Sequence, residues 1–163
     1  MTRTRVGLVV GLVLLGVALA VVLPNLRAGQ TAPTKRTIYM AAVEPKGGAS
    51  VTSEAFPTAP LPEGPGYVLK APDPAGRWEV SAYQWQPGFV LANQGEDVTL
   101  EIIGINGAEH PSSIEGLGVP PFTVRRGQVT TVNFRANRPG FYRIICHTHQ
   151  PTMVGYLVVL PRR

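Results

Sequence analysis

Four side chains that can bind a transition metal lie within eight residues near the C-terminus. The segment CHTHQPTM, residues 146–153, contains Cys146, His147, His149 and Met153. Cys146 is the only cysteine of the chain, so it has no partner for an internal disulfide. Thiolate and thioether sulfur are soft ligands that suit Cu(I), and imidazole binds both Cu(I) and Cu(II). The segment therefore indicates a copper site.

A trigonal copper site with a weak axial thioether needs a second imidazole besides one Cys, one His and one Met. Outside the C-terminal segment the chain has a single histidine, His110, in GINGAEHPSS. That segment follows a predicted strand, Asp97–Ile105, and we expect it to be a loop. His149 is preferred to His147, whose side chain should project away from the side taken by the adjacent thiolate. The predicted metal ligands are His110, Cys146, His149 and Met153.

The same side chains have other possible uses. Structural zinc sites favour Cys₄ to Cys₂His₂ ligand sets, so a Cys-His-His-Met set is unusual for zinc. A Cys–His nucleophile needs an orienting acid or amide and an oxyanion hole, and the loop offers only Gln150. A buried cysteine without a function is the third alternative. Residue types and spacing favour copper over all three, and we predict no catalytic residue.

Short strands, rather than helices, are expected to position these ligands. From Tyr67 onward, eight segments are rich in β-branched and aromatic residues, and turn signals such as Asn93-Gln94-Gly95 separate them. In Val129–Phe134, alternate residues would face opposite sides of a sheet. Eight strands over about 97 residues predict an antiparallel β-sandwich. Cys146 would end one strand and Met153 would begin the next.

The N-terminus has a different character. Val6–Leu23 is an apolar run of 18 residues, preceded by Arg3 and Arg5. As a helix the run would reach about 27 Å, close to the hydrocarbon thickness of a bilayer, which predicts a membrane anchor over residues 1–23. A cleaved signal peptide is the alternative, because Ala18-Leu19-Ala20 resembles a cleavage site. Both interpretations place the C-terminal part on the extracytoplasmic, periplasmic side of the cell membrane.

Residues 24–66 are rich in Pro, Gly, Ala, Ser and Thr and show no lasting periodicity. We therefore expect a tether with one short strand at 38–43, which leaves Met40 outside the sandwich domain of residues 67–163. The formal net charge is +5, but the basic residues are scattered and form no stripe interleaved with aromatic residues. We predict no nucleic-acid binding. Trp85 is expected in the core.

The segment from about Trp78 to Leu160 resembles a cupredoxin, most closely the copper-binding domain of cytochrome c oxidase subunit II and of nitrous-oxide reductase. The motifs that carry the resemblance are EHPSSIEG, FTVRRGQVTTVNF, NRPGFYRIIC and HQPTMVGYLVV. It implies an all-β, cupredoxin-like Greek-key β-sandwich, here preceded by one N-terminal transmembrane helix. The copper ligands carry over as His110, Cys146, His149 and Met153.

Two departures from the resemblance matter. In that family the loop has two cysteines that build a dinuclear centre, and this loop has only Cys146, which implies one copper ion in a mononuclear, blue-type (type 1) site. In many blue copper proteins the residue after the first histidine donates its N–H to the cysteine sulfur. Pro111 has no N–H, so the resemblance implies a less stabilised thiolate and a lower reduction potential.

We therefore expect a membrane-anchored extracytoplasmic protein that carries single electrons through one copper ion and is not an enzyme. The expected partner is a redox protein: a c-type cytochrome, another cupredoxin, or a terminal oxidase or reductase. Two alternatives stay open, an atypical component similar to cytochrome c oxidase subunit II and a copper delivery or storage protein. Delivery proteins usually hold copper in exposed, exchangeable Met and His sites, so the Cys146 loop favours the carrier.

Overall fold

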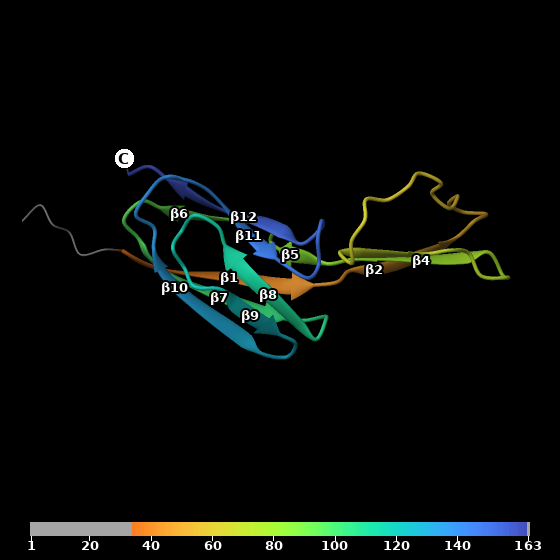
Figure 1. Cartoon of the computed structure of the whole chain (residues 1–163), viewed down its shortest axis with the longest axis horizontal. Coiled ribbons are helices and arrows are strands. Elements are labelled where there is room, and N and C mark those ends of the chain that lie inside the picture. Colours follow the sequence, from red (N-terminus) through yellow and green to blue (C-terminus); the bar gives the residue numbers. More distant parts are fainter. Residues whose placement is uncertain (1–33, 163) are drawn as a thin grey trace, which may run out of the picture. The chain divides into compact units, whose positions relative to one another are not determined.

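The computed structural model describes residues 34–162 (Figure 1). Over this range the chain forms twelve β-strands and no helix, which confirms the predicted all-β class. The strands are β1 (Lys35–Val43), β2 (Lys46–Ser50), β3 (Tyr67–Lys70), β4 (Arg77–Ala82), β5 (Gln84–Gln86), β6 (Phe89–Asn93), β7 (Asp97–Gly104), β8 (Glu109–Ile114), β9 (Phe122–Arg125), β10 (Val129–Arg135), β11 (Gly140–Cys146) and β12 (Val154–Leu160).

Two sheets form a β-sandwich. One sheet has the strand order β10-β7-β1-β5, and the other has the order β6-β12-β11-β8-β9. The sequence predicted antiparallel pairing, but each sheet also contains a parallel pair, β1 with β7 and β12 with β6. Consecutive strands such as β6 and β7 belong to different sheets, so the chain crosses repeatedly between the two. These parallel pairs join strands that are distant in the sequence, and the local pattern does not encode them.

The core lies between the two sheets. Along β7 the alternate residues Val98, Leu100 and Ile102 are buried, as expected for a strand with one face against a core. Trp85 of β5 is 2% exposed and belongs to the same cluster, which agrees with its predicted place in the core.

Strand β1 corrects the predicted boundary between tether and domain. It pairs in parallel with β7 over Lys35–Ala42, and the side chains of Ile38, Met40 and Ala42 are buried in the core. Met40 was expected outside the sandwich, and the structure places it at 3% exposure. The sequence predicted a short strand at 38–43 but assigned it to the tether, because Pro- and Gly-rich segments flank it and its pairing partner is far away along the chain. The remainder of the predicted tether before residue 34 lies outside the described residues.

Residues 44–83 connect β1 to β5 and contain a separate three-stranded sheet, β2-β4-β3. We refer to these residues as the extension. Trp78 of β4 packs edge-on against Phe56, with ring centroids 5.9 Å apart, and its Nε1–H donates to the carbonyl of Glu54 at 3.0 Å. The extension therefore has a small apolar contact of its own besides its hydrogen-bonded strands.

Within residues 34–162, no helix has the length and apolar character needed to cross a membrane. The predicted anchor, Val6–Leu23, lies outside the described residues.

Candidate metal centre

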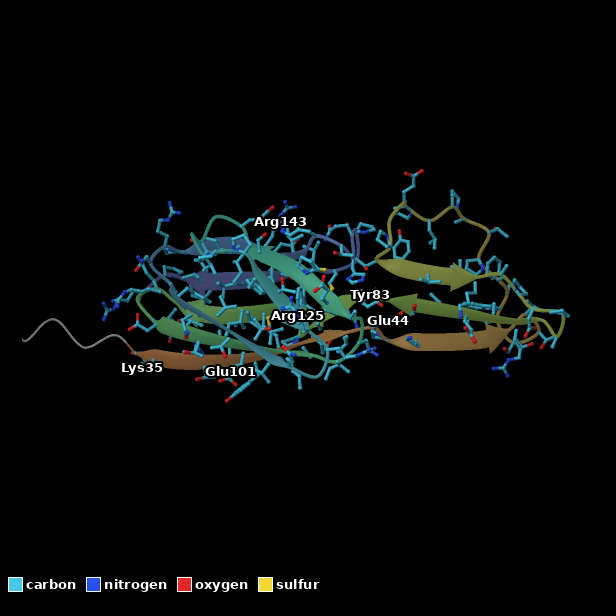
Figure 2. All side chains as sticks on the ribbon, turned by 60° about the horizontal axis from the view of Figure 1, so that its bottom comes forward. Lys35, Glu44, Tyr83, Glu101, Arg125 and Arg143 are labelled. Carbon is cyan, nitrogen blue, oxygen red and sulfur yellow. The ribbon has the colours of Figure 1, made fainter. Side chains whose placement is uncertain are left out.

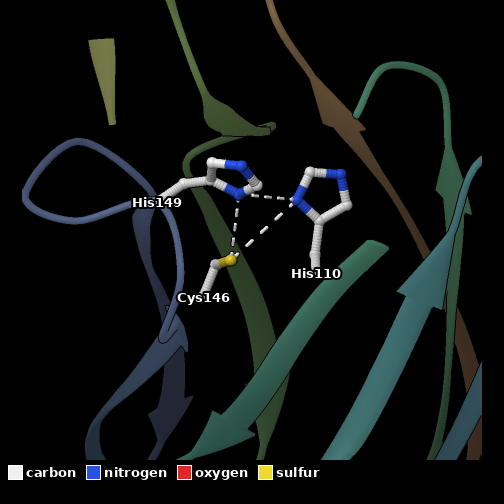
Figure 3. A group of neighbouring side chains, drawn as sticks. All are labelled: His110, Cys146 and His149. Atoms are coloured by element: carbon white, nitrogen blue, oxygen red, sulfur yellow. Dashed lines mark hydrogen bonds between the residues drawn. The ribbon is translucent and has the colours of Figure 1, made fainter. Parts of the chain in front are cut away.

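Three of the four predicted ligands come together at one end of the sandwich (Figure 3). The Nδ1 atoms of His110 and His149 are 3.1 Å apart. Sγ of Cys146 lies 3.3 Å from Nδ1 of His149 and 3.9 Å from Nδ1 of His110. Metal–ligand bonds of about 2.0–2.3 Å place the corners of a trigonal site about 3.5–3.8 Å apart. The observed distances bracket that range, so the three atoms are arranged as the corners of a trigonal metal site.

Two neighbouring strands hold His110 and Cys146. Cys146 is the last residue of β11 and pairs with Ser112 of β8, two positions after His110. Both ligand side chains are fully buried. His110 thus lies on a strand and not in the loop that the sequence predicted. Pro111 concealed this strand, because proline in a run argues against a ladder position.

A short loop between β11 and β12 holds His149. Across its base, the Cys146 N–H donates to the carbonyl of Met153 at 3.1 Å, and the Met153 N–H donates to the carbonyl of His149 at 3.0 Å. The Gln150 side chain donates to the carbonyl of Cys146 at 2.6 Å. These bonds fix the loop so that His149 turns inward to Cys146. His147 is exposed, with Nε2 3.0 Å from the Ser113 hydroxyl, and stays outside the group.

Met153 lies directly before β12 and is fully buried in the same core cluster as Cys146. Its backbone bonds to Cys146 and His149 place the residue beside both ligands. The Met153 side chain is therefore buried in the same core cluster as the Cys146 thiol.

The tautomer of His110 suits metal binding. Its Nε2 lies 2.7 Å from the backbone carbonyl of Asn106, which can only accept a hydrogen bond. Nε2 must therefore carry the proton, and Nδ1 presents its lone pair to Cys146 and His149. The Asn106 side chain in turn accepts the N–H of Glu44 at 3.0 Å, so the residue that orients His110 is itself held.

Opposing effects act on the Cys146 thiol. Burial raises its pKa, while hydrogen bonds from the N–H groups of His149 and Thr148 and from the Ser112 hydroxyl act in the other direction. The residue after His110 is a proline without an N–H, as noted from the sequence, yet the sulfur has other donors. Burial outweighs these donors and the pKa of the thiol is raised in the metal-free protein, which agrees in direction with the predicted poorly stabilised thiolate.

The surroundings of the second imidazole favour its neutral form. Burial and the neighbouring His110 lower the pKa of His149. Neutral imidazole is the form that binds a metal ion.

Tyr83 is an aromatic neighbour of the group that the sequence did not identify as relevant. Its ring stacks on His149, with centroids 3.8 Å apart and planes inclined by 24°, and meets His110 edge-on at 5.8 Å. The segment Tyr83-Gln84-Trp85 has an alternating aromatic pattern that signals a strand. Only the fold brings that strand to the ligands, because its sheet partner is β1.

No protein-family model and no curated protein sequence matches this chain. Solved structures do share its fold. A copper nitrite reductase from Nitrosomonas europaea gives a TM-score of 0.50 at 16% identity, covering 79% of this chain and 42% of that chain. A multicopper oxidase from Pseudomonas thermotolerans gives 0.51 at 15% identity, covering 80% and 31%. A further multicopper oxidase gives 0.48 at 18% identity, covering 80% and 40%. The chain thus spans less than half the length of these structures.

The two-sheet sandwich and the group of His110, Cys146 and His149 define a cupredoxin fold with a site that fits copper. In the described part of the chain this is the one place where three His, Cys or acidic side chains converge for metal binding. The expected cofactor, copper, agrees with the donor set of two imidazoles and one thiolate.

The prediction that this protein is not an enzyme is wrong when set against these structures, because the proteins that share its fold at TM-scores of 0.50 and 0.51 are a nitrite reductase and a multicopper oxidase. The physical reason is general. A one-electron centre can supply electrons to a catalytic centre as readily as to another carrier, so a ligand loop by itself does not exclude catalysis.

Proposed function

We propose that the protein transfers single electrons through one type 1 copper ion bound by His110, Cys146 and His149, with the Met153 thioether as a weak axial ligand. The observation that supports this proposal is the convergence of Nδ1, Nδ1 and Sγ within 3.1–3.9 Å of one another. A copper ion held by these residues supplies a one-electron couple between Cu(II) and Cu(I).

Rigid placement of the ligands favours electron transfer. His110 and Cys146 lie on adjacent strands, and backbone hydrogen bonds tie His149 and Met153 to the end of β11. Because these ligands cannot rearrange, their positions change little when the copper ion gains or loses an electron. Electron transfer is therefore fast. His149 is half-buried, and its Nε2 edge points away from the group (Figure 3), so the ring offers a short route to the surface.

The fourth ligand distinguishes copper from structural zinc. A structural zinc site takes four Cys, His or carboxylate ligands. Among the described residues, the group contains three such side chains. The buried thioether of Met153 is the neighbouring donor, and a weak thioether suits copper.

The proposal extends to the setting of the domain. We infer a periplasmic domain tethered to the cell membrane by residues 1–23, with a c-type cytochrome or a terminal oxidase or reductase as its redox partner. The support is the apolar run Val6–Leu23 behind Arg3 and Arg5. This role fits a protein that shuttles electrons and also a domain that supplies electrons within a catalytic assembly, as in an atypical subunit II.

The test uses the full chain, because a fragment that begins at residue 66 lacks β1 and its core residues. One equivalent of Cu(II) should produce an intense thiolate-to-copper absorption band and a mononuclear EPR signal. The band should disappear in Cys146→Ser and His149→Ala and persist in the matched control His147→Ala. A colourless copper complex would contradict the proposal and favour a delivery protein. Two copper ions per chain with a mixed-valence EPR pattern would favour a dinuclear, subunit II-like centre.

A further inference from the structure

The ring of Tyr83 covers one face of a proposed copper ligand. Its centroid lies 3.8 Å from that of His149, and the two planes are inclined by 24°, a stacked geometry. Of the two imidazoles, His110 lies on a paired strand and His149 lies in a loop, so strand pairing does not hold His149. A stacked aromatic ring restricts rotation of the imidazole about its side-chain bonds.

Tyr83 has a neighbour in the extension at each end. Its backbone N–H donates to the carbonyl of Gly66 at 2.7 Å, and burial together with the nearby Glu44 carboxylate raises the pKa of its hydroxyl. That carboxylate accepts a hydrogen bond from the Ser81 hydroxyl at 2.8 Å and pairs with Lys46 at 3.1 Å. Figure 2 shows Tyr83 beside Glu44 where the extension joins the sandwich.

The extension also binds the ligand loop directly. The Gly66 N–H donates to the carbonyl of Gln150 at 2.9 Å, and the Thr152 hydroxyl donates to the carbonyl of Gly66 at 2.6 Å. A Cβ at position 66 would lie 2.8 Å from the carbonyl of His149, so only glycine allows this close approach. The Gly66 carbonyl thus accepts from Thr152 of the loop and from Tyr83 at the same time.

We propose that Tyr83 is a positioning residue of the metal centre: by stacking on His149 it sets the orientation of that ligand, and the extension holds Tyr83 in place. The inference rests on the proposed copper site for its consequence, but the stacking itself belongs to the metal-free protein. When the orientation of His149 is fixed, the site retains copper, and the coordination geometry is the same in every molecule. Removal of the ring should therefore loosen the site, whereas removal of the hydroxyl alone should not.

The first measurement is made without metal. Ring currents from Tyr83 should shift the ring protons of His149 upfield in the NMR spectrum of the full chain. The shift should persist in Tyr83→Phe, which keeps the aromatic ring, and vanish in Tyr83→Leu. Absence of the shift in the unmodified protein, or its persistence in Tyr83→Leu, would overturn the proposal.

The second measurement follows copper. After loading with Cu(II), transfer of copper to a chelator should be roughly tenfold faster or more in Tyr83→Leu, the effect expected of residues that orient ligands, and near the unmodified rate in Tyr83→Phe. The EPR lines of Tyr83→Leu should also broaden. The control is Tyr39→Leu, the same change at a residue of β1 that is 68% exposed.

Equal copper loss and equal EPR spectra in Tyr83→Leu and Tyr39→Leu would show that the stack does not position the ligand. Fast copper loss in Tyr83→Phe as well would assign the effect to the hydroxyl and overturn the role of the ring. If the unmodified protein forms no thiolate-to-copper band, the proposed function fails. The metal-free ring shifts then decide the positioning role separately.

Discussion

Cys146 at the end of β11 lies directly opposite Ser112 of β8, two positions after His110 on the same strand. This register sets the distance between thiolate and imidazole, and it places the Ser112 hydroxyl beside the sulfur. A slip of one residue would turn His110 to the other face of the sheet. The ligand distance is therefore a property of strand pairing and not of the ligand loop alone.

Ser112→Ala should lower the reduction potential of the copper-loaded protein. In the metal-free protein the hydroxyl donates its single proton to the carbonyl of His110 at 2.9 Å, and it can rotate to donate to the Cys146 thiolate of the copper-loaded protein. Its loss leaves more electron density on the thiolate, which favours Cu(II). We expect a decrease on the order of 50 mV, since one hydrogen bond contributes about 1 kcal/mol and 59 mV corresponds to a tenfold change for one electron.

Redox titration followed by the visible band measures this decrease. Ser113→Ala is the matched control, because the neighbouring hydroxyl contacts the exposed ring of His147 and not the sulfur. An unchanged potential in Ser112→Ala would show that backbone N–H groups alone stabilise the thiolate.

Met40→Ala should destabilise the protein strongly. The side chain is 3% exposed in the core, so its truncation should lower the free energy of unfolding by about 2–5 kcal/mol. Tyr39→Ala, one residue earlier and 68% exposed, should change it far less. Urea unfolding measures both. Equal, small effects of the two substitutions would show that β1 belongs to the tether, as the sequence predicted.

Trp85 should tolerate one substitution much better than another. It is 2% exposed, and among the described residues its Nε1–H has no hydrogen-bond partner. Trp85→Ala should lower the free energy of unfolding by about 3–5 kcal/mol through the cavity it leaves. Trp85→Phe should cost under about 1.5 kcal/mol, because it also removes an unpaired buried N–H. If both variants unfold at the same urea concentration, the indole must have a specific partner.

Glu96 should contribute to stability in a pH-dependent way. Burial by itself raises the pKa of this carboxyl, but hydrogen bonds from the Asn93 side chain and N–H, together with Arg36, outweigh it and lower the pKa. A lowered pKa in the folded state stabilises the protein above the carboxyl's unfolded value, about 4.3. That contribution is lost as the pH falls through the folded value.

Glu96→Gln should therefore lower the free energy of unfolding by about 1–2 kcal/mol at pH 7, while the two proteins should converge at acid pH. Unfolding by urea at several pH values measures the difference. The thiolate-to-copper band should not change, because Glu96 bonds to Asn93 at the turn before β7 and not to the ligand loop. If the difference in the free energy of unfolding between the two proteins grew toward acid pH, it would contradict a lowered pKa of Glu96 in the folded state.

The donor chemistry and the strand class could be predicted from local sequence. The spacing of Cys146, His149 and Met153 lies within one loop, and residue types alone define which metal such a set prefers. Alternation within β7 and β10 likewise records which residues face a core. Both kinds of information are carried by residues close together along the chain, so both can be predicted without a structure.

The tertiary structure decided what depends on distant pairing. The parallel pairing of β1 with β7 brought Met40 into the core, and the pairing of β8 with β11 placed His110 on a strand beside Cys146. The stacking of Tyr83 on His149 depends on β5 joining β1 and on the extension reaching the loop through Gly66. Contacts of this kind form between segments whose local patterns are independent of one another. The sequence alone thus determined the ligand chemistry and the β class, and the fold decided the geometry that brings His110, Cys146 and His149 together with the residues that support them.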